Sequence, residues 1–330
     1  MKSKAGLLES ASPPLTRRDF LKFSTLMAGV LALPWSYAGR IAQALAAASR
    51  LPVVWLEFQD CTGDSESFLR ASQGPNPISP GVTDPGVIDL LLDFISLEYH
   101  ETLMAPSGAN SEKSLNDVMQ NYPGEYVVVV EGSIPTALNG AYCTIRGRSA
   151  LSIVREVCAG ARLVIGAGTC AFDGGLAAAA PNPTGAVGVR EAVPGLTNLV
   201  NLPGCPANVV NIAAVIVHLI TFGTLPSTDQ LGRPYFAYGE DIHDECEREH
   251  HYEAGRFVLA WGDDGHRRGW CLFRMGCKGP ATHNNCSSVL WNDGVCWPVR
   301  AGHGCAGCSE PHFWDNLTPL YTPLPDDDRL

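Results

Sequence analysis

The chain has 330 residues, of which 45% are apolar and 17% charged, and this is enough for two globular domains. Its formal net charge of −11 argues against nucleic acid as a partner. Twelve cysteines in a chain that can bury a large core without disulfides leave three interpretations: disulfides, zinc sites, or iron–sulfur clusters, whose ligands can be scattered along a sequence.

The first fifty residues have the pattern of a targeting segment. Arg17 and Arg18 open a basic string, an apolar stretch follows from Phe23 to Trp35, and small residues follow around Gln43–Ala48. This order is typical of an export signal, and paired arginines are typical of the twin-arginine route. We therefore predict an exported, periplasmic protein. The alternative is an amphipathic helix that stays on a cytoplasmic protein, or on one peripheral to the membrane.

Neither end of the chain predicts a membrane anchor. The apolar stretch is too short for a stable span, and the C-terminal string LPDDDRL has no apolar run of about 20 residues. A protein that receives metal clusters before export must travel folded, as the twin-arginine route allows. The signal and the cysteine count thus support each other.

Alternating strands and helices are predicted next. Short apolar runs predict buried strands at 53–58, 96–104, 126–131, 161–165 and 196–201. The segments between and after them predict helices at 65–72, 87–94, 114–121, 150–159 and 207–222. This alternation predicts a parallel sheet that is covered on both faces.

Three cysteines follow strands of this sheet. Cys61 follows the first strand, Cys170 the fourth and Cys205 the fifth, and the loop EGSIP follows the third. Ligands of open α/β sheets bind beyond the carboxyl ends of the strands, so we expect these cysteines to meet at one edge. After about Pro226 the strand-like runs stop, and Gly, Pro, His, Cys and Trp dominate. Metal clusters could supply the cross-links that this segment needs to fold.

Several strings resemble the small subunits of NiFe hydrogenases. They are VVWLEFQDCTGDSESFLR, EGSIP, GTCA, APNPTGAVGV, PGCP, IHDEC, WCLFRMGCKGP, NNC and WPVRAGHGCAGCSEPHFWD, which occur in the family's order over nearly all of residues 51–315. The resemblance is greatest to the oxygen-insensitive, actinobacterial-type branch. It implies a targeting segment at 1–50, a flavodoxin-like doubly wound domain at 51–225, and an irregular, mostly helical and loop cluster domain at 226–330.

The resemblance implies a proximal 4Fe–4S cluster bound by Cys61, Cys170 and Cys205. Asp64 stands where the family has a fourth cysteine, and the actinobacterial-type branch is known for this substitution. A carboxylate is a harder iron ligand than a thiolate. The alternative role for Asp64 is to cap the helix that starts near Ser65.

Two further clusters are implied for the C-terminal domain. A distal 4Fe–4S cluster matches His243, Cys246, Cys271 and Cys277, and a medial 3Fe–4S cluster matches Cys286, Cys305 and Cys308. Pro298 fits the position where a fourth medial cysteine would stand. Cys296 is either a spare thiol or a fourth medial ligand through a shifted loop.

Other residues have local interpretations. Glu66 and Glu131 could each relay protons or only form local hydrogen bonds, and Cys143 and Cys158 are expected to be small apolar residues of the core. The extra cysteine pair of oxygen-tolerant membrane hydrogenases would fall at 63 and 175, where glycines stand. Any oxygen tolerance would then depend on Asp64.

The implied function is electron transfer. The nickel–iron centre would lie on an obligate large subunit, because this chain lacks the paired CxxC motifs that bind nickel there. Electrons would leave through an acceptor such as a cytochrome or a quinone-linked protein, and the heterodimers are expected to form a higher oligomer. The alternatives are an iron–sulfur subunit of a related quinone-reducing or formate-linked complex, or a secreted protein stapled by disulfides.

Overall fold

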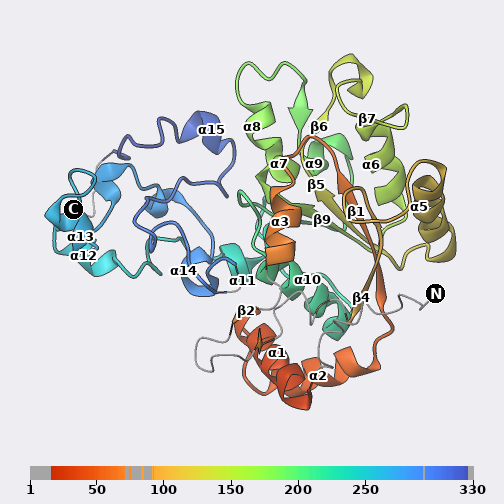
Figure 1. Cartoon of the computed structure of the whole chain (residues 1–330), viewed down its shortest axis with the longest axis horizontal. Helices are drawn as coiled ribbons and strands as arrows, with labels where there is room; N and C mark the ends of the chain where they lie inside the picture. The colour runs from red at the N-terminus through yellow and green to blue at the C-terminus, as the bar shows by residue number, and fades with distance from the viewer. Residues whose placement is uncertain are drawn as a thin grey trace, which may run out of the picture.

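The computed structural model describes residues 16–70, 74–75, 83–84, 91, 93–292 and 294–325. At its centre lies a five-stranded parallel sheet with the order β11-β9-β5-β1-β4 (Figure 1). The strands are β1 (Leu51–Glu57), β4 (Ile95–His100), β5 (Val127–Glu131), β9 (Leu163–Ala167) and β11 (Leu199–Leu202). Counted along the chain, this is the 2-1-3-4-5 order of flavodoxin-like sheets. The predicted α/β fold class is confirmed.

Helices cover both faces of the sheet because side chains alternate along each strand. Val54 and Leu56 point to the face covered by α5 (Ala109–Asn121) and α6 (Ala150–Ala159), while Val53 and Trp55 pack with α3 (Gly63–Arg70) and α10 (Val209–Phe222). β1, β5 and β9 are buried along their whole lengths, as expected of central parallel strands. The helix predicted at 87–94 lies largely outside the described residues.

Short elements complete this part of the fold. The helices α7 (Gly168–Asp173), α8 (Gly175–Ala178) and α9 (Val189–Ala192) and the 3-10 helix η1 (Ala137–Gly140) sit between longer elements. The two-stranded pairs are β2 (Gly74–Pro75) with β3 (Thr83–Asp84), β6 (Ile134–Pro135) with β10 (Ala186–Val187), and β7 (Thr144–Ile145) with β8 (Arg148–Ser149).

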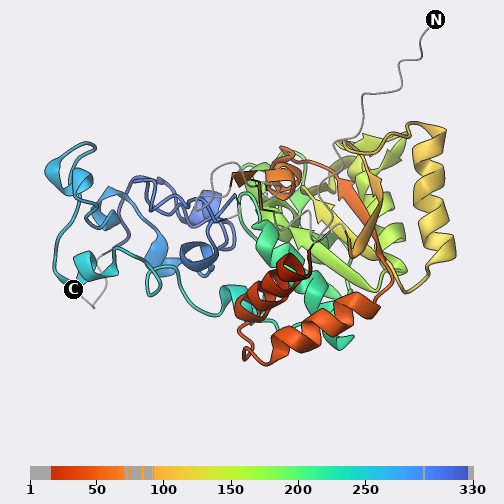
Figure 2. The ribbon, with the colours of Figure 1, turned by 60° about the horizontal axis from the view of Figure 1, so that its bottom comes forward.

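The predicted targeting segment forms two helices, α1 (Arg17–Val30) and α2 (Tyr37–Ala47). They pack against each other and against α10, as Figure 2 shows. The apolar side chains of α1 and α2 join the core, among them the buried Phe23 and Ile41, whereas Arg17 and Arg18 are exposed. Across the described residues every helix is too short or too polar to span a bilayer.

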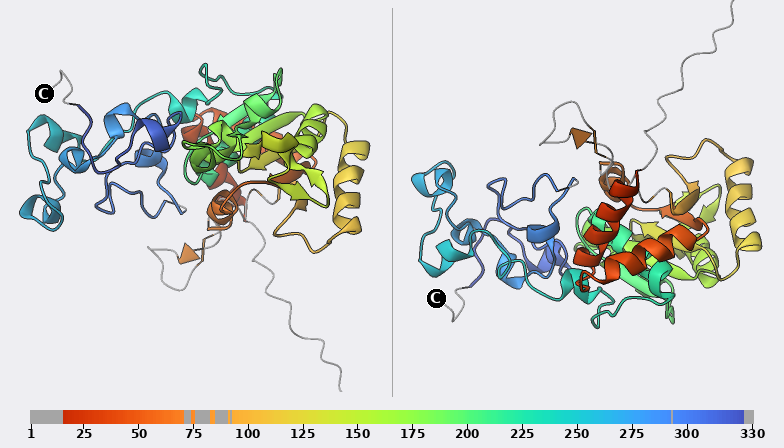
Figure 3. Two further views of the ribbon diagram at one scale, coloured as in Figure 1. Left: turned by 90° about the horizontal axis from the view of Figure 1, so that it is seen from above. Right: turned by 90° about the horizontal axis from the view of Figure 1, so that it is seen from below.

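The C-terminal region extends from one end of the sheet domain, as both views in Figure 3 show. It consists of loops and short helices: α11 (Tyr235–Tyr238), α12 (Glu249–Glu253), α13 (Asp264–Arg267), η2 (Phe273–Met275), η3 (Gly279–Ala281), α14 (Cys286–Val289) and α15 (Phe313–Asn316). Two small apolar clusters form its core, and four of the predicted cysteine ligands lie within or against the larger one. The cysteines thus sit where a region without sheet or long helix needs cross-links.

A buried arginine joins the two regions. The guanidinium of Arg233 donates to Asp229 Oδ2 at 2.8 Å and to Glu310 Oε1 at 3.0 Å, and it also donates to the Ser309 carbonyl. Ser309 directly follows Cys308, so this ion pair fixes the loop of a predicted medial ligand against the chain that leaves the sheet domain. Its three partners satisfy the buried charge, as burial requires.

Candidate metal centres

All twelve cysteines are free in the structure. The predicted ligands gather in three groups. The proximal group is Cys61, Asp64, Cys170 and Cys205, the medial group is Cys286, Cys305 and Cys308, and the distal group is His243, Cys246, Cys271 and Cys277. Within the described residues, no three His, Cys, Asp or Glu side chains meet closely enough to hold a single metal ion.

Three chain segments that directly follow strands at the carboxyl edge of the sheet hold the proximal group. Cys61 and Asp64 lie between β1 and the first turn of α3, Cys170 lies on α7 directly after β9, and Cys205 lies between β11 and α10. β1 and β5 flank the point where the strand order reverses, and this is where open α/β sheets bind their ligands. Strand order therefore places Cys61 at the position where a ligand is expected.

The proximal side chains are close enough to influence one another. Burial, together with the nearby Cys205, Asp64 and Cys61, raises the pKa of the Cys170 thiol to about 12. A Cβ on Gly168 would lie 2.2 Å from Asp64 Oδ2, so only glycine leaves room for the carboxyl group there. Cys61 and Cys205 are exposed, whereas Asp64 is only 7% exposed. The group is thus closed on the Asp64 side and open on the other.

A buried glutamate, rather than Asp64, caps α3. Glu131 is fully buried and accepts hydrogen bonds from the backbone N–H groups of Asp64 at 2.9 Å and Ser65 at 3.0 Å, and from Trp55 Nε1 at 2.9 Å. It thereby satisfies N–H groups at the start of the helix, which is the role of a cap. The Asp64 carboxylate accepts instead from the Ala207 N–H at 2.6 Å. The capping alternative for Asp64 is therefore wrong, and the local role predicted as one option for Glu131 is observed.

The environment of Asp64 disfavours its negative charge. Burial, with the nearby Glu131, raises the pKa of Asp64 to about 8. A metal cation in contact with the carboxylate would offset this penalty, because an opposite charge favours the ionised form. Asp64 therefore suits a role as a metal ligand better than a role as an unpaired buried acid.

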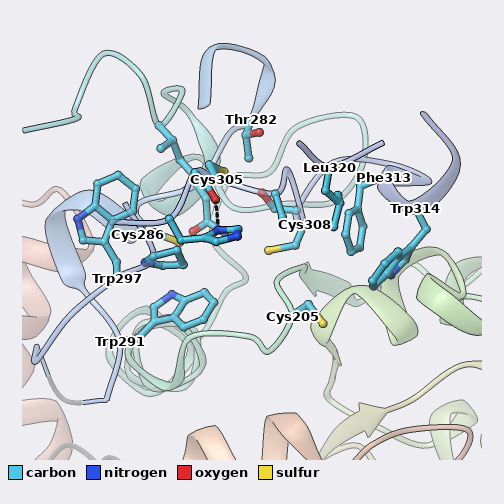
Figure 4. A pocket seen from close by; sticks show the side chains of 17 residues that line it. Cys205, Thr282, Cys286, Trp291, Trp297, Cys305, Cys308, Phe313, Trp314 and Leu320 are labelled. Carbon is cyan, nitrogen blue, oxygen red and sulfur yellow. Dashed lines mark hydrogen bonds between the residues drawn. The ribbon is translucent and has the colours of Figure 1, made fainter. Parts of the chain in front are cut away.

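The medial group lines an apolar cavity of about 250 Å³. Figure 4 shows Cys286, Cys305 and Cys308 around it, with Trp291 and Trp297 on the Cys286 side and Phe313 on the Cys308 side. Burial raises the pKa of Cys286 and of Cys308 to about 12. In this pocket the cysteines are neutral thiols until a metal displaces their protons.

Pro298 and Cys296 occupy different positions relative to this cavity. Pro298 is among its lining residues. The Cys296 thiol lies outside the lining and donates to the carbonyl of Trp297 at 3.4 Å. This arrangement favours the interpretation of Cys296 as a spare thiol.

The distal group lines a smaller cavity together with Arg248. The His243 ring packs edge-on against Tyr252, with ring centroids 4.5 Å apart. Burial raises the pKa of Cys246 to about 11 and that of Cys271 to about 12. The imidazole therefore lines the same pocket as the three thiols that the resemblance groups with it.

The three groups form a row in space, in which each group contacts the next. Cys205 also lines the medial cavity, and the Thr169 hydroxyl, beside Cys170, donates to the Cys308 carbonyl. On the other side, the Cys305 N–H donates to Cys277 Sγ at 3.2 Å. The medial group thus lies between the proximal and distal groups.

The residues present fit iron–sulfur clusters. Buried cysteines with one histidine are ligands that such clusters use, and an apolar pocket of the medial size accommodates more than a single ion. A carboxylate among three thiols is a harder ligand that iron accepts. The other predicted site residue, Glu66, is exposed on α3 and forms an ion pair with Arg70 at 2.6 Å.

The sequence alone does not identify the supporting residues. It leaves the role of Glu131 open, and it gives no role to Arg248, to Lys278 or to Trp291, which lines the medial cavity with Cys286. Arg248 lies two residues after Cys246 and Lys278 directly after Cys277, so a charged residue beside a predicted ligand is the available signal.

The two cysteines expected in the core differ in burial. Cys158 is buried on α6 as expected, whereas Cys143 is half-buried. Burial raises the pKa of both thiols, so they remain neutral apolar groups at neutral pH.

Two families match the chain. Residues 61–219 match "NADH ubiquinone oxidoreductase, 20 Kd subunit", and residues 238–321 match the family of the C-terminal region of the NiFe/NiFeSe hydrogenase small subunit. The quinone-reactive Ni/Fe-hydrogenase small chain of Wolinella succinogenes is 44% identical over 314 residues, which cover 94% of this chain and 84% of that one.

Solved structures give the same likeness. A reduced, active form of the Ni-Fe-Se hydrogenase from Desulfomicrobium baculatum is 32% identical, with a TM-score of 0.73 over 84% of this chain and 100% of the other. An actinobacterial-type NiFe-hydrogenase from Ralstonia eutropha H16 is 25% identical, with a TM-score of 0.68 over 84% of each chain. The NADH ubiquinone oxidoreductase family matches only the sheet domain. The hydrogenase small-subunit family matches the region that holds the medial and distal groups.

Proposed function

Because the chain belongs to the small-subunit family of NiFe hydrogenases, we propose that it carries electrons from a hydrogen-splitting large subunit to an external acceptor. The observation that carries this proposal is that the three metal-ligand groups form a row in space. Each group contacts the next, from the sheet edge into the C-terminal region. The alternative is an iron–sulfur subunit of another redox complex. The match of residues 238–321 to the C-terminal region of the hydrogenase small subunit argues against it, because the NADH ubiquinone oxidoreductase family matches residues 61–219 only.

Each group would hold one cluster. We propose a 4Fe–4S cluster on Cys61, Asp64, Cys170 and Cys205, a 3Fe–4S cluster on Cys286, Cys305 and Cys308, and a 4Fe–4S cluster on His243, Cys246, Cys271 and Cys277. When bound, such clusters accept and release single electrons at potentials set by ligands, hydrogen bonds and burial. The chain itself keeps their surroundings apolar and supplies the tuning groups. Pro298 in the medial lining supports a missing fourth ligand there.

The proximal face is where we place the large subunit. Cys61 and Cys205 are exposed there, and Leu176 on α8, which follows α7 and its Cys170, is exposed as well. A large subunit docked on this face would bury these groups and bring the nickel–iron centre near the proximal cluster. Obligate interfaces of this kind are large and apolar.

The proposal extends to location and acceptor. The exposed Arg17 and Arg18 at the start of α1 support export by the twin-arginine route to the periplasm. The acceptor would be a cytochrome or a quinone-linked protein, and the name of the Wolinella relative supports the second of these. Asp64 is the feature that supports a likeness to the actinobacterial-type branch, and we propose that oxygen tolerance rests on it.

Purification tests the function directly. The complex with its large subunit, isolated anaerobically, should be brown and should contain about eleven irons in this chain, from two 4Fe centres and one 3Fe centre. EPR during a redox titration should show three separate signals. A folded complex without iron and sulfide would rule out the proposed function.

Gly168 offers a test of the proximal pocket that leaves every ligand in place. In Gly168→Ala the new Cβ would meet the Asp64 carboxylate at 2.2 Å, so we expect an altered proximal EPR signal and lower iron content. Gly147→Ala is the matched control, because the two glycines have φ of +77° and +76° and a Cβ on Gly147 meets nothing within 4 Å. Both variants should lose about 1–2 kcal/mol from the left-handed backbone. Identical EPR spectra in the two would contradict the pocket geometry.

A further inference from the structure

Two buried cations flank the distal ligands. Arg248 is 8% exposed and Lys278 is 3% exposed, although both residue types are almost never buried unless paired. Arg248 lies two residues after Cys246 and shares the cavity lining with His243, Cys246, Cys271 and Cys277. The distal group therefore has buried positive charge within its own wall.

Hydrogen bonds hold Arg248 in that wall. Its backbone N–H donates to Cys246 Sγ at 3.4 Å, and its guanidinium Nη1 donates to the Trp270 carbonyl at 2.9 Å. Trp270 directly precedes Cys271, so the arginine bridges the loops of two distal ligands.

Lys278 adds a second buried positive charge near the distal group. It directly follows Cys277, its backbone N–H donates to the Cys305 carbonyl at 2.8 Å, and its ammonium group donates to the Thr322 carbonyl. It therefore lies between the distal and medial groups. Two acidic residues lie on the same side: Glu249, half-buried, lines the distal cavity, and Glu247, directly after Cys246, is exposed and pairs with Arg300 at 2.7 Å. Solvent screens both more than it screens Arg248.

The charged side chains buried at the proximal end are of the opposite type. Glu131 is fully buried there, and Glu57 is buried in a pair with His100, whereas a bound metal would offset the charge of the Asp64 carboxylate. Adding an electron makes a cluster more negative, so a buried cation beside it stabilises the reduced form, and the low dielectric of the interior strengthens this effect. The buried side chains around the three groups thus favour an electron on a distal cluster over one on a proximal cluster.

We propose that Arg248 raises the reduction potential of the distal cluster and thereby biases this subunit toward carrying electrons outward, in the direction of hydrogen oxidation. This proposal rests on the proposed function and adds the direction of electron flow and the residue that sets it. Arg248 is a positioning and tuning residue and not a metal ligand.

The test is an EPR-monitored redox titration of the intact complex with its large subunit. In Arg248→Gln, the distal cluster should show a more negative midpoint, with the ratio of reduced to oxidised cluster at fixed potential falling about tenfold, which is about 59 mV for one electron. Arg248→Lys keeps the charge and should restore most of the midpoint. Arg267→Gln is the matched control, because the Arg267 side chain is 66% exposed and pairs with Asp264 on the surface.

The outcomes separate this inference from the proposed function. A wild-type complex without iron would end both. An unchanged distal midpoint in an iron-complete Arg248→Gln complex, or an equal shift in Arg267→Gln, would overturn the inference and leave the electron-transfer function standing. If Arg248→Gln loses its distal irons, Arg248→Lys provides the test. A distal midpoint in Arg248→Lys as negative as the one expected for loss of the charge would show that the hydrogen-bond geometry, and not the charge, sets the potential.

Discussion

Replacing Cys308 by alanine is expected to remove about three irons, the content of one 3Fe centre, and to leave the other two EPR signals in place. The rate of hydrogen-dependent reduction of a dye that accepts electrons at the distal end should fall by more than about 100-fold. A fall of about 100-fold is the upper end of the loss caused by removing only an outer-shell partner of a metal ligand. The reason is position: Cys308 lies in the medial cavity and next to Cys205 of the proximal group. Without the medial cluster, the proximal and distal groups lose the link between them.

Cys296→Ala is the matched control for this prediction. The change is chemically the same and falls in the same region, but the Cys296 thiol lies outside the cavity lining and contacts the Trp297 carbonyl. We expect full iron content and an unchanged medial signal. Iron loss in Cys296→Ala would make Cys296 a fourth medial ligand, and full iron content in Cys308→Ala would refute the medial assignment. Iron analysis with EPR of both variants decides.

The sheet was predictable because its signals are local. Central strands such as β5 are continuous apolar runs, and the loops after β1, β9 and β11 carry the cysteines, so strand order alone brings Cys61, Cys170 and Cys205 to one edge. Strand ends were less accurate. The strand predicted at 96–104 ends at His100, where the chain turns and the Met104 N–H donates to the His100 carbonyl.

The supporting contacts of the site were not predictable because they join residues far apart in the sequence. Glu131 caps α3 from 66 and 67 positions away, and nothing in the string EGSIP indicates which helix start it will meet. The burial of Arg248 is a similar case, since arginine in a polar string is ordinarily a surface residue. By contrast, the members of the medial and distal groups were named from the resemblance to a family, because the resembling strings contain those residues, and they stay predictions.

Asp64 carries the prediction with the second largest effect. Asp64→Asn keeps the size of the side chain and an oxygen that can accept from the Ala207 N–H, but it removes the carboxylate. We expect loss of one proximal iron or a changed proximal EPR signal, because a neutral amide is a much weaker iron ligand than a carboxylate. Asp60→Asn is the control, since it removes a half-buried carboxyl next to Cys61, one that accepts from the Thr62 N–H at 3.0 Å. Its EPR signals and iron content should match the wild type.

Asp64→Cys tests the same position in the opposite sense. A thiolate there would complete a set of four soft ligands, which favours less oxidised iron than a carboxylate does. We expect a fully loaded proximal cluster with a new spectrum, hydrogen oxidation close to the wild type without oxygen, and a loss of about tenfold or more in air, the scale on which changes at a metal site act. If both the spectrum and the activity in air stayed unchanged, Asp64 would not be a functional ligand. The buried carboxyl would then have only the local role of accepting from the Ala207 N–H, and any oxygen tolerance would need another source.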